Sequence, residues 1–393
     1  MFRVRLGFAL FGMFWGTWAV AALDIQQFLG LSDAELGLLV AATVVGTSVT
    51  NVVGGALAER HGLARGMVVA LSIWGPLVLA VAAIGHGGAW MVAFLAVVAA
   101  GGLLDVVLNI ASTELLVGRP GQLLRAHSAY NLGTVAGAAV TGVVLAAGWS
   151  WRWSFAVAGI AGLALAAAVH RRPGDLPVEP NPSSEHVTLR DALLELRRSR
   201  LVRLAVVFAL GALVEGGIGT FGVLYLRDKL EVAVLAGAGA YVVGQSLATI
   251  TRYSLGADAA ERRLGGTGPA RLGLGVAAIG LVVEAATDLP GVAAAGLAVA
   301  SIGVATYWPL LSGVASGASD RPGLAVGGVS AAGYLGFLAG APLVGAVAEG
   351  AGLRAGVLVL AAAAGIAASI PLRAIGRPRH GMAPEVRVET PAA

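Results

Sequence analysis

The sequence predicts an all-α membrane protein whose twelve transmembrane helices form two pseudo-symmetric six-helix bundles. Of its 393 residues, 57% are hydrophobic and only 12% are charged, whereas about a quarter of the residues in a soluble domain are charged. Apolar runs of about 20 residues, the length that crosses a bilayer, recur along the chain. One long hydrophilic break, at residues 171–200, separates six such runs from six more.

The predicted spans follow from these apolar runs. Those of the first half are 6–28, 34–58, 66–85, 90–116, 129–147 and 155–169. Those of the second half are 204–226, 235–255, 271–287, 291–315, 324–347 and 354–375. We therefore expect an N-terminal bundle over 1–170, a cytoplasmic linker over 171–200, a C-terminal bundle over 201–376 and a disordered cytoplasmic tail over 377–393. From Thr188 the linker has the cap and apolar spacing of a short amphipathic helix on the membrane surface.

The distribution of basic residues predicts the orientation. With both termini and the linker in the cytoplasm, all but four of the 26 Lys and Arg residues lie on that side. The four exceptions are Arg152, Arg227, Lys229 and Arg354. The excess follows the positive-inside rule, so we expect a multi-pass protein of a bacterial cytoplasmic membrane. Basic loops also explain the high isoelectric point, and no nucleic-acid partner is expected.

Several chemistries are excluded by the residues present. The chain has no cysteine, and its six histidines have no metal-ligand spacing. It has no G-x-x-x-x-G-K phosphate loop, and its single lysine is Lys229. We found no nucleophile–base pair, so we expect no metal, no cofactor and no enzymatic activity.

Glu215 lies in the middle of the seventh predicted span, roughly 17 Å from its start at 1.5 Å per residue. An ionisable side chain at this depth is costly unless it has a function. One interpretation is a carboxylate satisfied by neighbouring helices. The other is a group that accepts and releases a proton during transport, with Asp105 as a possible second proton site.

Asp105 and Asn109 lie four residues apart in the fourth span and therefore share one face, followed by Ser112. Such a polar stripe must face other helices or water. It indicates either a hydrogen-bonded cluster between helices or a second titrating site with a substrate contact at Asn109.

Aromatic and amide side chains supply further candidates for the lining of a substrate cavity. Pro309 predicts a bend in the tenth span beside Tyr307 and Trp308, because proline lacks a backbone donor. Trp15 and Trp18 of the first span and Asn131 of the fifth are the remaining candidates. Core or interface packing is the alternative explanation for the tryptophans.

The loop after the second span reads Gly55-x-x-x-Glu59-Arg60-x-Gly62-x-x-Arg65. This stretch resembles the loop signature of the major facilitator superfamily of secondary transporters, with Glu59 where that signature usually has Asp. A partial second copy follows the eighth span. Other stretches resemble the fucose-permease-like, sugar-transporter-like bacterial branch. They include Asp105 to Asn109, Gly118-Arg119-Pro120, His127, Asn131, Glu215-Gly216, Tyr225 to Asp228, Arg252, Asp258 and Gly340-Ala341-Pro342.

The signature predicts an inward gate. Its carboxylate can sit at the positive end of a helix from the other half, and Arg60 can bridge to an acid. We expect the gate to comprise Gly55, Glu59, Arg60, Gly62 and Arg65. Arg252, paired with Asp258 or Glu261, is expected to play the matching role in the second half. The alternative is that the basic residues only set topology.

The resemblance implies the twelve-helix fold, a central cavity between the halves and movement of a small solute, often coupled to protons. We expect a secondary transporter in the lipid bilayer that acts as a monomer by alternating access. Sugar-like uptake and export of a drug or metabolite remain open as alternatives. A membrane sensor or scaffold that transports nothing is a third, and it predicts that Glu215 is dispensable.

Overall fold

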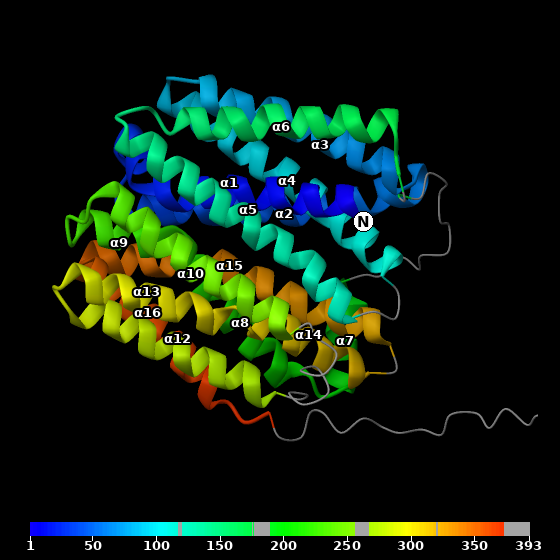
Figure 1. Cartoon of the computed structure of the whole chain (residues 1–393). Coiled ribbons are helices and arrows are strands. Elements are labelled where there is room, and N and C mark those ends of the chain that lie inside the picture. Colours follow the sequence, from blue (N-terminus) through cyan, green and yellow to red (C-terminus); the bar gives the residue numbers. More distant parts are fainter. Residues whose placement is uncertain (117–119, 175, 177–188, 256–266, 320, 373–393) are drawn as a thin grey trace, which may run out of the picture.

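The computed structural model describes residues 1–116, 120–174, 176, 189–255, 267–319 and 321–372. The regular elements in these ranges are helices, and most of them run side by side along one axis (Figure 1). The N-terminus and α7 (Leu189–Arg198) lie at one end of the bundle, called here the α7 end. The turn after α9 (Val223–Asp228) lies at the other, called the opposite end.

The first half contributes six helices, each long enough to cross a membrane. They are α1 (Phe2–Leu29), α2 (Asp33–His61), α3 (Leu63–Ala83), α4 (Gly87–Leu115), α5 (Pro120–Ala146) and α6 (Arg152–Arg171). The largest difference from the predicted boundaries is at α5, which starts at Pro120 rather than at 129. Proline suits the first turn of a helix, where its missing N–H has no partner to lose.

The second half is less regular. After α7 come α8 (Val202–Gly217), the π-helical turn η1 (Ile218–Gly222), α9, α10 (Val234–Leu255) and α12 (Gly268–Ala286). Then follow α13 (Pro290–Val304), α14 (Tyr307–Gly317), α15 (Pro322–Ala351) and α16 (Leu353–Ser369). Helix α16 ends before its predicted limit of 375, because Ile370 is extended ahead of Pro371 and the residue before a proline avoids the helical conformation.

Ten helical segments of the described residues are long and apolar enough to cross a membrane, and α16 is a shorter apolar helix. Two spans are interrupted. The seventh, Val202–Asp228, contains the π turn Ile218–Gly222, which begins three residues after Glu215. The tenth breaks at Ala305 and Thr306, between α13 and α14, just before the bend predicted at Pro309. The predicted tail, 377–393, lies outside the described residues.

Close helix contacts position the central residues. On α1, a Cβ at Gly12 would lie 1.9 Å from the Tyr130 carbonyl oxygen, and on α5 a Cβ at Gly133 would lie 1.9 Å from that of Ala9. Only glycine permits this approach of the two backbones. It fixes the rotation of α5 and therefore the direction of Asn131.

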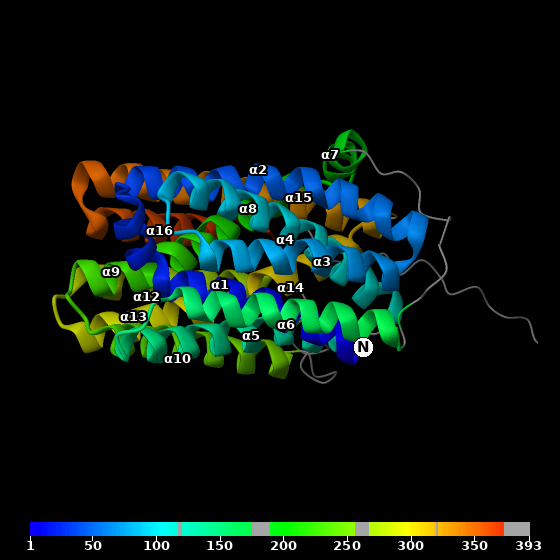
Figure 2. The ribbon, with the colours of Figure 1, turned by 90° about the horizontal axis from the view of Figure 1, so that it is seen from above.

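Helices from the two halves meet along two lines. Helix α2 packs on α15, and α5 packs on α10, as both views show (Figures 1 and 2). At the opposite end the first line is tight: a Cβ at Gly345 of α15 would lie 2.3 Å from the carbonyl oxygen of Asp33. Asn131 of α5 and Arg252 of α10, described next, belong to the helices of the second line.

Candidate functional site

Glu215 forms an ion pair with Arg252 in the middle of the bundle. Its Oε1 lies 3.2 Å from Nη2 of Arg252, which α10 contributes. Its Oε2 accepts a hydrogen bond of 2.9 Å from the hydroxyl of Tyr307, at the start of α14. Both oxygens of this mid-span carboxylate therefore have a donor, as the cost of burying an unpaired charge requires.

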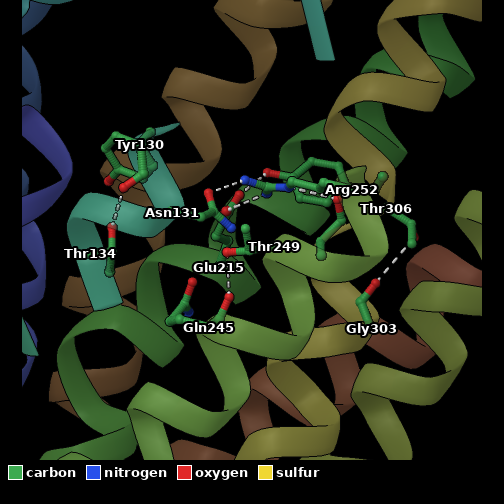
Figure 3. Close-up of polar contacts among 11 residues, drawn as sticks. Tyr130, Asn131, Thr134, Glu215, Gln245, Thr249, Arg252, Gly303 and Thr306 are labelled. Carbon is green, nitrogen blue, oxygen red and sulfur yellow. Dashed lines mark hydrogen bonds and ion pairs between the residues drawn. The ribbon is translucent and has the colours of Figure 1, made fainter. Parts of the chain in front are cut away.

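Arg252 links three parts of the chain (Figure 3). Beyond Glu215, its Nη1 donates to Oδ1 of Asn131 on α5 at 2.6 Å, and its Nε donates to the Ala305 carbonyl at 2.9 Å. Asn131 belongs to the first half, so this guanidinium connects the two halves. In Figure 3 Asn131 and Glu215 both point toward it.

The acceptor at Ala305 follows from the sequence. In a regular helix its carbonyl would accept from the backbone nitrogen four residues later, at position 309. That residue is Pro309, which has no N–H. The chain breaks here between α13 and α14, and the freed carbonyl accepts from Arg252 instead.

The ion pair is only partly shielded. The side chain of Glu215 is 30% exposed and that of Arg252 is 12% exposed, while Asn131 and Tyr307 are buried. Glu215 thus borders space that a water molecule can reach, although it lies in the middle of a span. A carboxylate in such a position can exchange a proton with water.

Asp105 and Asn109 form a second cluster. Asn109 Nδ2 donates to Asp105 Oδ1 at 3.0 Å and to the Asp105 carbonyl at 2.8 Å. The hydroxyl of Tyr334, on α15, lies 3.4 Å from Asp105 Oδ2 and joins the fourth helix to the second half. Glu215 bonds to Arg252 and Tyr307 rather than to this cluster.

The aromatic candidates have different environments. Trp18 is 1% exposed and stacks on Phe94 with ring centroids 4.7 Å apart, so it is a core residue and not part of a cavity lining. Tyr307 is buried and acts through its hydroxyl. Trp15 and Trp308 are partly exposed. The ring of Trp308 packs on that of Phe208, with centroids 4.5 Å apart.

The predicted gate lies largely outside the described side chains. Those of Gly55, Glu59 and Arg60 are not among them, and neither Asp258 nor Glu261 is described. Gly62 precedes α3 with a φ of 80°, a conformation that favours glycine, and Arg65 is exposed. The gate remains a prediction. The described partners of Arg252 are Glu215, Asn131 and Ala305, and its expected pairing with Asp258 or Glu261 lies outside the described residues.

An ion pair at the opposite end was not predicted from the sequence. Arg227 of α9 places Nη1 2.5 Å from Oδ2 of Asp24 on α1, and it also donates to the Val20 carbonyl at 2.9 Å. Nearby, the Ser32 hydroxyl donates to Glu349 of α15 at 2.8 Å. In the sequence Arg227 was one of the four basic residues on the outer side and part of the resembling stretch Tyr225 to Asp228. An acid near one span end and a base near another are visible in the sequence, but their pairing is not.

Comparison with known proteins agrees with this architecture. The family model of the Major Facilitator Superfamily matches residues 6–318. Membrane protein MosC of Rhizobium meliloti is 25% identical over 365 residues, which cover 91% of this chain and 86% of that protein.

Solved structures share the fold at low identity. A bacterial homologue of the human lysosomal transporter Spinster, in an inward-facing and occupied conformation, has a TM-score of 0.73 at 14% identity, covering 94% of both chains. The nucleoside transporter NupG has a TM-score of 0.71 at 13% identity, covering 93% of this chain and 97% of that one.

The chain belongs to the major facilitator superfamily. It is a multi-pass membrane protein and a transporter rather than an enzyme. The expected fold, twelve helices in the arrangement of this superfamily, is confirmed.

Proposed function

We propose that the chain is a secondary active transporter that moves a small solute across a bacterial cytoplasmic membrane by alternating access, coupled to protons through Glu215. The observation that carries this proposal is the mid-span ion pair of Glu215 and Arg252, which reaches the first half through Asn131. A proton taken up by Glu215 removes the negative charge of this pair. It thereby changes the interactions at the point where the two halves meet.

Asp105 is the second proton site of this proposal. Its contact to Tyr334 crosses from α4 to α15, so its protonation state also acts on an interface between the halves. Asn109 holds the carboxylate from its own helix. The two acids lie in separate clusters and can therefore be tested separately.

The proposed movement is a rocking of 1–170 against 201–376, with 171–200 as the connection and both termini in the cytoplasm. The opposite end then faces outward. There, Asp24 with Arg227 and Ser32 with Glu349 hold the halves together, which supports a conformation closed to the outside. The chain is proposed to act as a monomer.

For the solute, the motif resemblance supports sugar-like uptake of the fucose-permease-like type. One observation favours the alternative, transport of an amphipathic drug or metabolite. Several partly exposed side chains of the surrounding helices are aromatic: Trp308, Tyr334 and Phe337 from the second half, and Phe11, Trp15 and Tyr130 from the first. Aromatic faces suit an apolar solute body.

The test is uptake into proteoliposomes that contain the purified full-length chain, driven by an imposed pH gradient and screened over sugars and amphipathic compounds. We expect Glu215→Gln to fold and to lose pH-driven uptake, and Asp105→Asn to lose part of it. The matched control is Glu231→Gln, at an exposed acid between α9 and α10. Unchanged pH-driven uptake by Glu215→Gln would contradict the proposal and favour a sensor or scaffold.

A further inference from the structure

We propose that Arg252 becomes the binding site for the anionic group of the solute when Glu215 takes up a proton. The solute class is then a small organic anion with an apolar or aromatic body. This inference rests on the proposed proton-coupled transport, and it adds the charge of the solute, the residue that binds it and the charge balance of the cycle.

The argument begins with the partners of Arg252. Glu215 is the acid that pairs with it, whereas its contacts to Asn131 and Ala305 are made to neutral oxygens. A guanidinium remains charged at all physiological pH values. Protonation of Glu215 therefore leaves a largely buried cation without its counter-charge, which is unfavourable until another anion approaches.

Arg252 is suited to receive that anion. The planar guanidinium offers parallel donors that match a carboxylate or a phosphate. Of these, Nη2 is the one that now bonds to Glu215, whose side chain borders the water-accessible space. Nε and Nη1 stay attached to Ala305 and Asn131 and hold the group in place.

Other polar groups around the pair do not replace the missing charge. The hydroxyls of Tyr130, Tyr241 and Tyr307 lie within electrostatic range of Glu215, and His127 lies within that range of Arg252. Asp105 also lies within electrostatic range of Tyr130, but its oxygens already accept hydrogen bonds from Asn109 and Tyr334. Among the residues that the structure describes, Glu215 is the acid that pairs with Arg252, so an incoming anion would supply the counter-charge that its protonation removes.

The protonated carboxyl of Glu215 also contributes directly. Oε2 continues to accept a hydrogen bond from Tyr307. Oε1 no longer bonds to Arg252, and the proton that it now carries can be donated in a hydrogen bond to the solute. The anion is then held by one donor from Arg252 and one from Glu215. One proton enters with each single negative charge, so the loaded carrier gains no net charge.

The aromatic surroundings indicate the body of the solute. Trp308 directly follows Tyr307, and its ring lies 6.5 Å from Tyr334 and 6.3 Å from Phe337. On the first half Tyr130 precedes Asn131, and its ring lies 5.9 Å from Phe11. Partly exposed aromatic rings thus follow or precede residues of this network in both halves. An arylalkyl carboxylate would place its charged group on Arg252 and its aromatic body against these rings.

The test uses three probes of one shape: phenylacetate, phenylacetamide and phenethylamine. We measure their binding to the detergent-purified full-length protein by thermal shift and calorimetry. The wild type should bind phenylacetate more tightly at pH 6 than at pH 8. Glu215→Gln, which imitates the protonated acid, should bind it at least about tenfold tighter than the wild type at pH 8, the scale of one charge-assisted hydrogen bond. Its affinity should not depend on pH.

Two variants guard against indirect effects. Arg252→Gln should lose phenylacetate binding, and Arg203→Gln, at an exposed arginine, should keep it. If Glu215→Gln fails to fold, the pH dependence of wild-type binding and the loss in Arg252→Gln carry the test. Equal affinity for phenylacetate at the two pH values, or preferred binding of the amide or amine, overturns the inference.

Transport separates this inference from the proposed function. Uptake of phenylacetate into proteoliposomes should follow an imposed pH gradient and should not respond to an imposed membrane potential. If the amide or amine moves with the pH gradient through Glu215 while phenylacetate does not, the transporter proposal stands and the anion inference fails. If Glu215→Gln keeps pH-driven uptake, the proposed function itself fails.

Discussion

Two arginines of the second half, Arg227 and Arg252, make the same kinds of contact at different depths. Each pairs with a carboxylate and donates to a backbone carbonyl. The acid of Arg227 is Asp24, which belongs to the first half. The acid of Arg252 is Glu215, which belongs to its own half, and its partner across the interface is the neutral amide of Asn131.

In the proposed alternating access, this difference separates a contact between the halves that has to break from one within a half that can persist. The pair of Arg227 and Asp24 must break whenever the opposite end opens. The pair of Arg252 and Glu215 can persist through that movement, because only the bond to Asn131 has to break. A neutral contact at the centre suits a pivot that is used in every cycle, and a charged contact at the end suits a lock.

The largest effect is expected from Arg252→Gln, which removes the centre of the network. Glu215 keeps only Tyr307, and the expected loss of stability is about 2 kcal/mol, below the value for fully buried pairs because Glu215 is partly exposed. Uptake driven by a pH gradient should fall at least about 100-fold. Chemical denaturation and proteoliposome uptake measure the two effects, with Arg203→Gln as the control. Near-normal uptake would show that the network does not carry coupling.

Asn131→Asp replaces the neutral contact between Arg252 and Asn131 by a charged pair between the two halves, like the pair of Arg227 and Asp24. Arg252 then has acids in both halves, so the halves are tied by charge at the pivot. Uptake should slow about tenfold, as expected for one added charged hydrogen bond. Asn131→Ala should cost less, because it removes only a neutral acceptor. A faster rate in the aspartate variant would contradict the distinction between lock and pivot.

Asp24→Asn weakens the lock at the opposite end. A pair that is partly open to solvent is worth up to about 1 kcal/mol, which corresponds to about fivefold in population. The natural chain has no cysteine, so Ala238→Cys, at a buried position of α10 that contacts Gly142 of α5, can report opening by maleimide labelling.

Labelling of that cysteine should be about fivefold faster in Asp24→Asn. Asp288→Asn is the matched control, since Asp288 pairs with Arg354 within the second half at the same end. Equal acceleration by both variants would mean that the pair with Arg227 is not a specific lock.

The smallest effect concerns α7, far from either arginine. Ser199 and Ser319 donate to Glu195 at 2.5 and 2.7 Å, and these bonds hold the pKa of its carboxyl below the ordinary value for glutamate. Because the folded-state pKa is lowered, this stabilisation is present above the ordinary pKa and is lost as the pH falls through the folded-state value.

Hydrogen exchange in α7 should therefore rise at acid pH in the wild type. In Glu195→Gln it should be raised already at neutral pH, while transport stays nearly unchanged. A wild-type exchange rate in that variant would show that Glu195 does not hold α7 to the residues before α15.

Much of the fold was predictable because each span carries its own signal. The apolar runs predicted the helices, Pro309 predicted the interruption near Tyr307, and the single acid in an apolar run led to Glu215. The partners of these residues were less predictable. Depth in the membrane follows from position along a span, but the direction of a side chain depends on how its helix is rotated. The sequence therefore did not show that Arg252 pairs with Glu215, and it placed the buried Trp18 in a cavity lining.

The sequence by itself determined the number and the approximate limits of the helices, because a bilayer sets the length of an apolar helix and proline limits its ends. It also determined that an acid lies near mid-span. Only the tertiary structure decided that Glu215 pairs with Arg252, that Asn131 reaches it from the other half, and that Asp24 meets Arg227. These contacts join residues 37, 121 and 203 positions apart. They depend on helix rotations that close backbone approaches, such as those at Gly12 and Gly133, set between helices rather than within them.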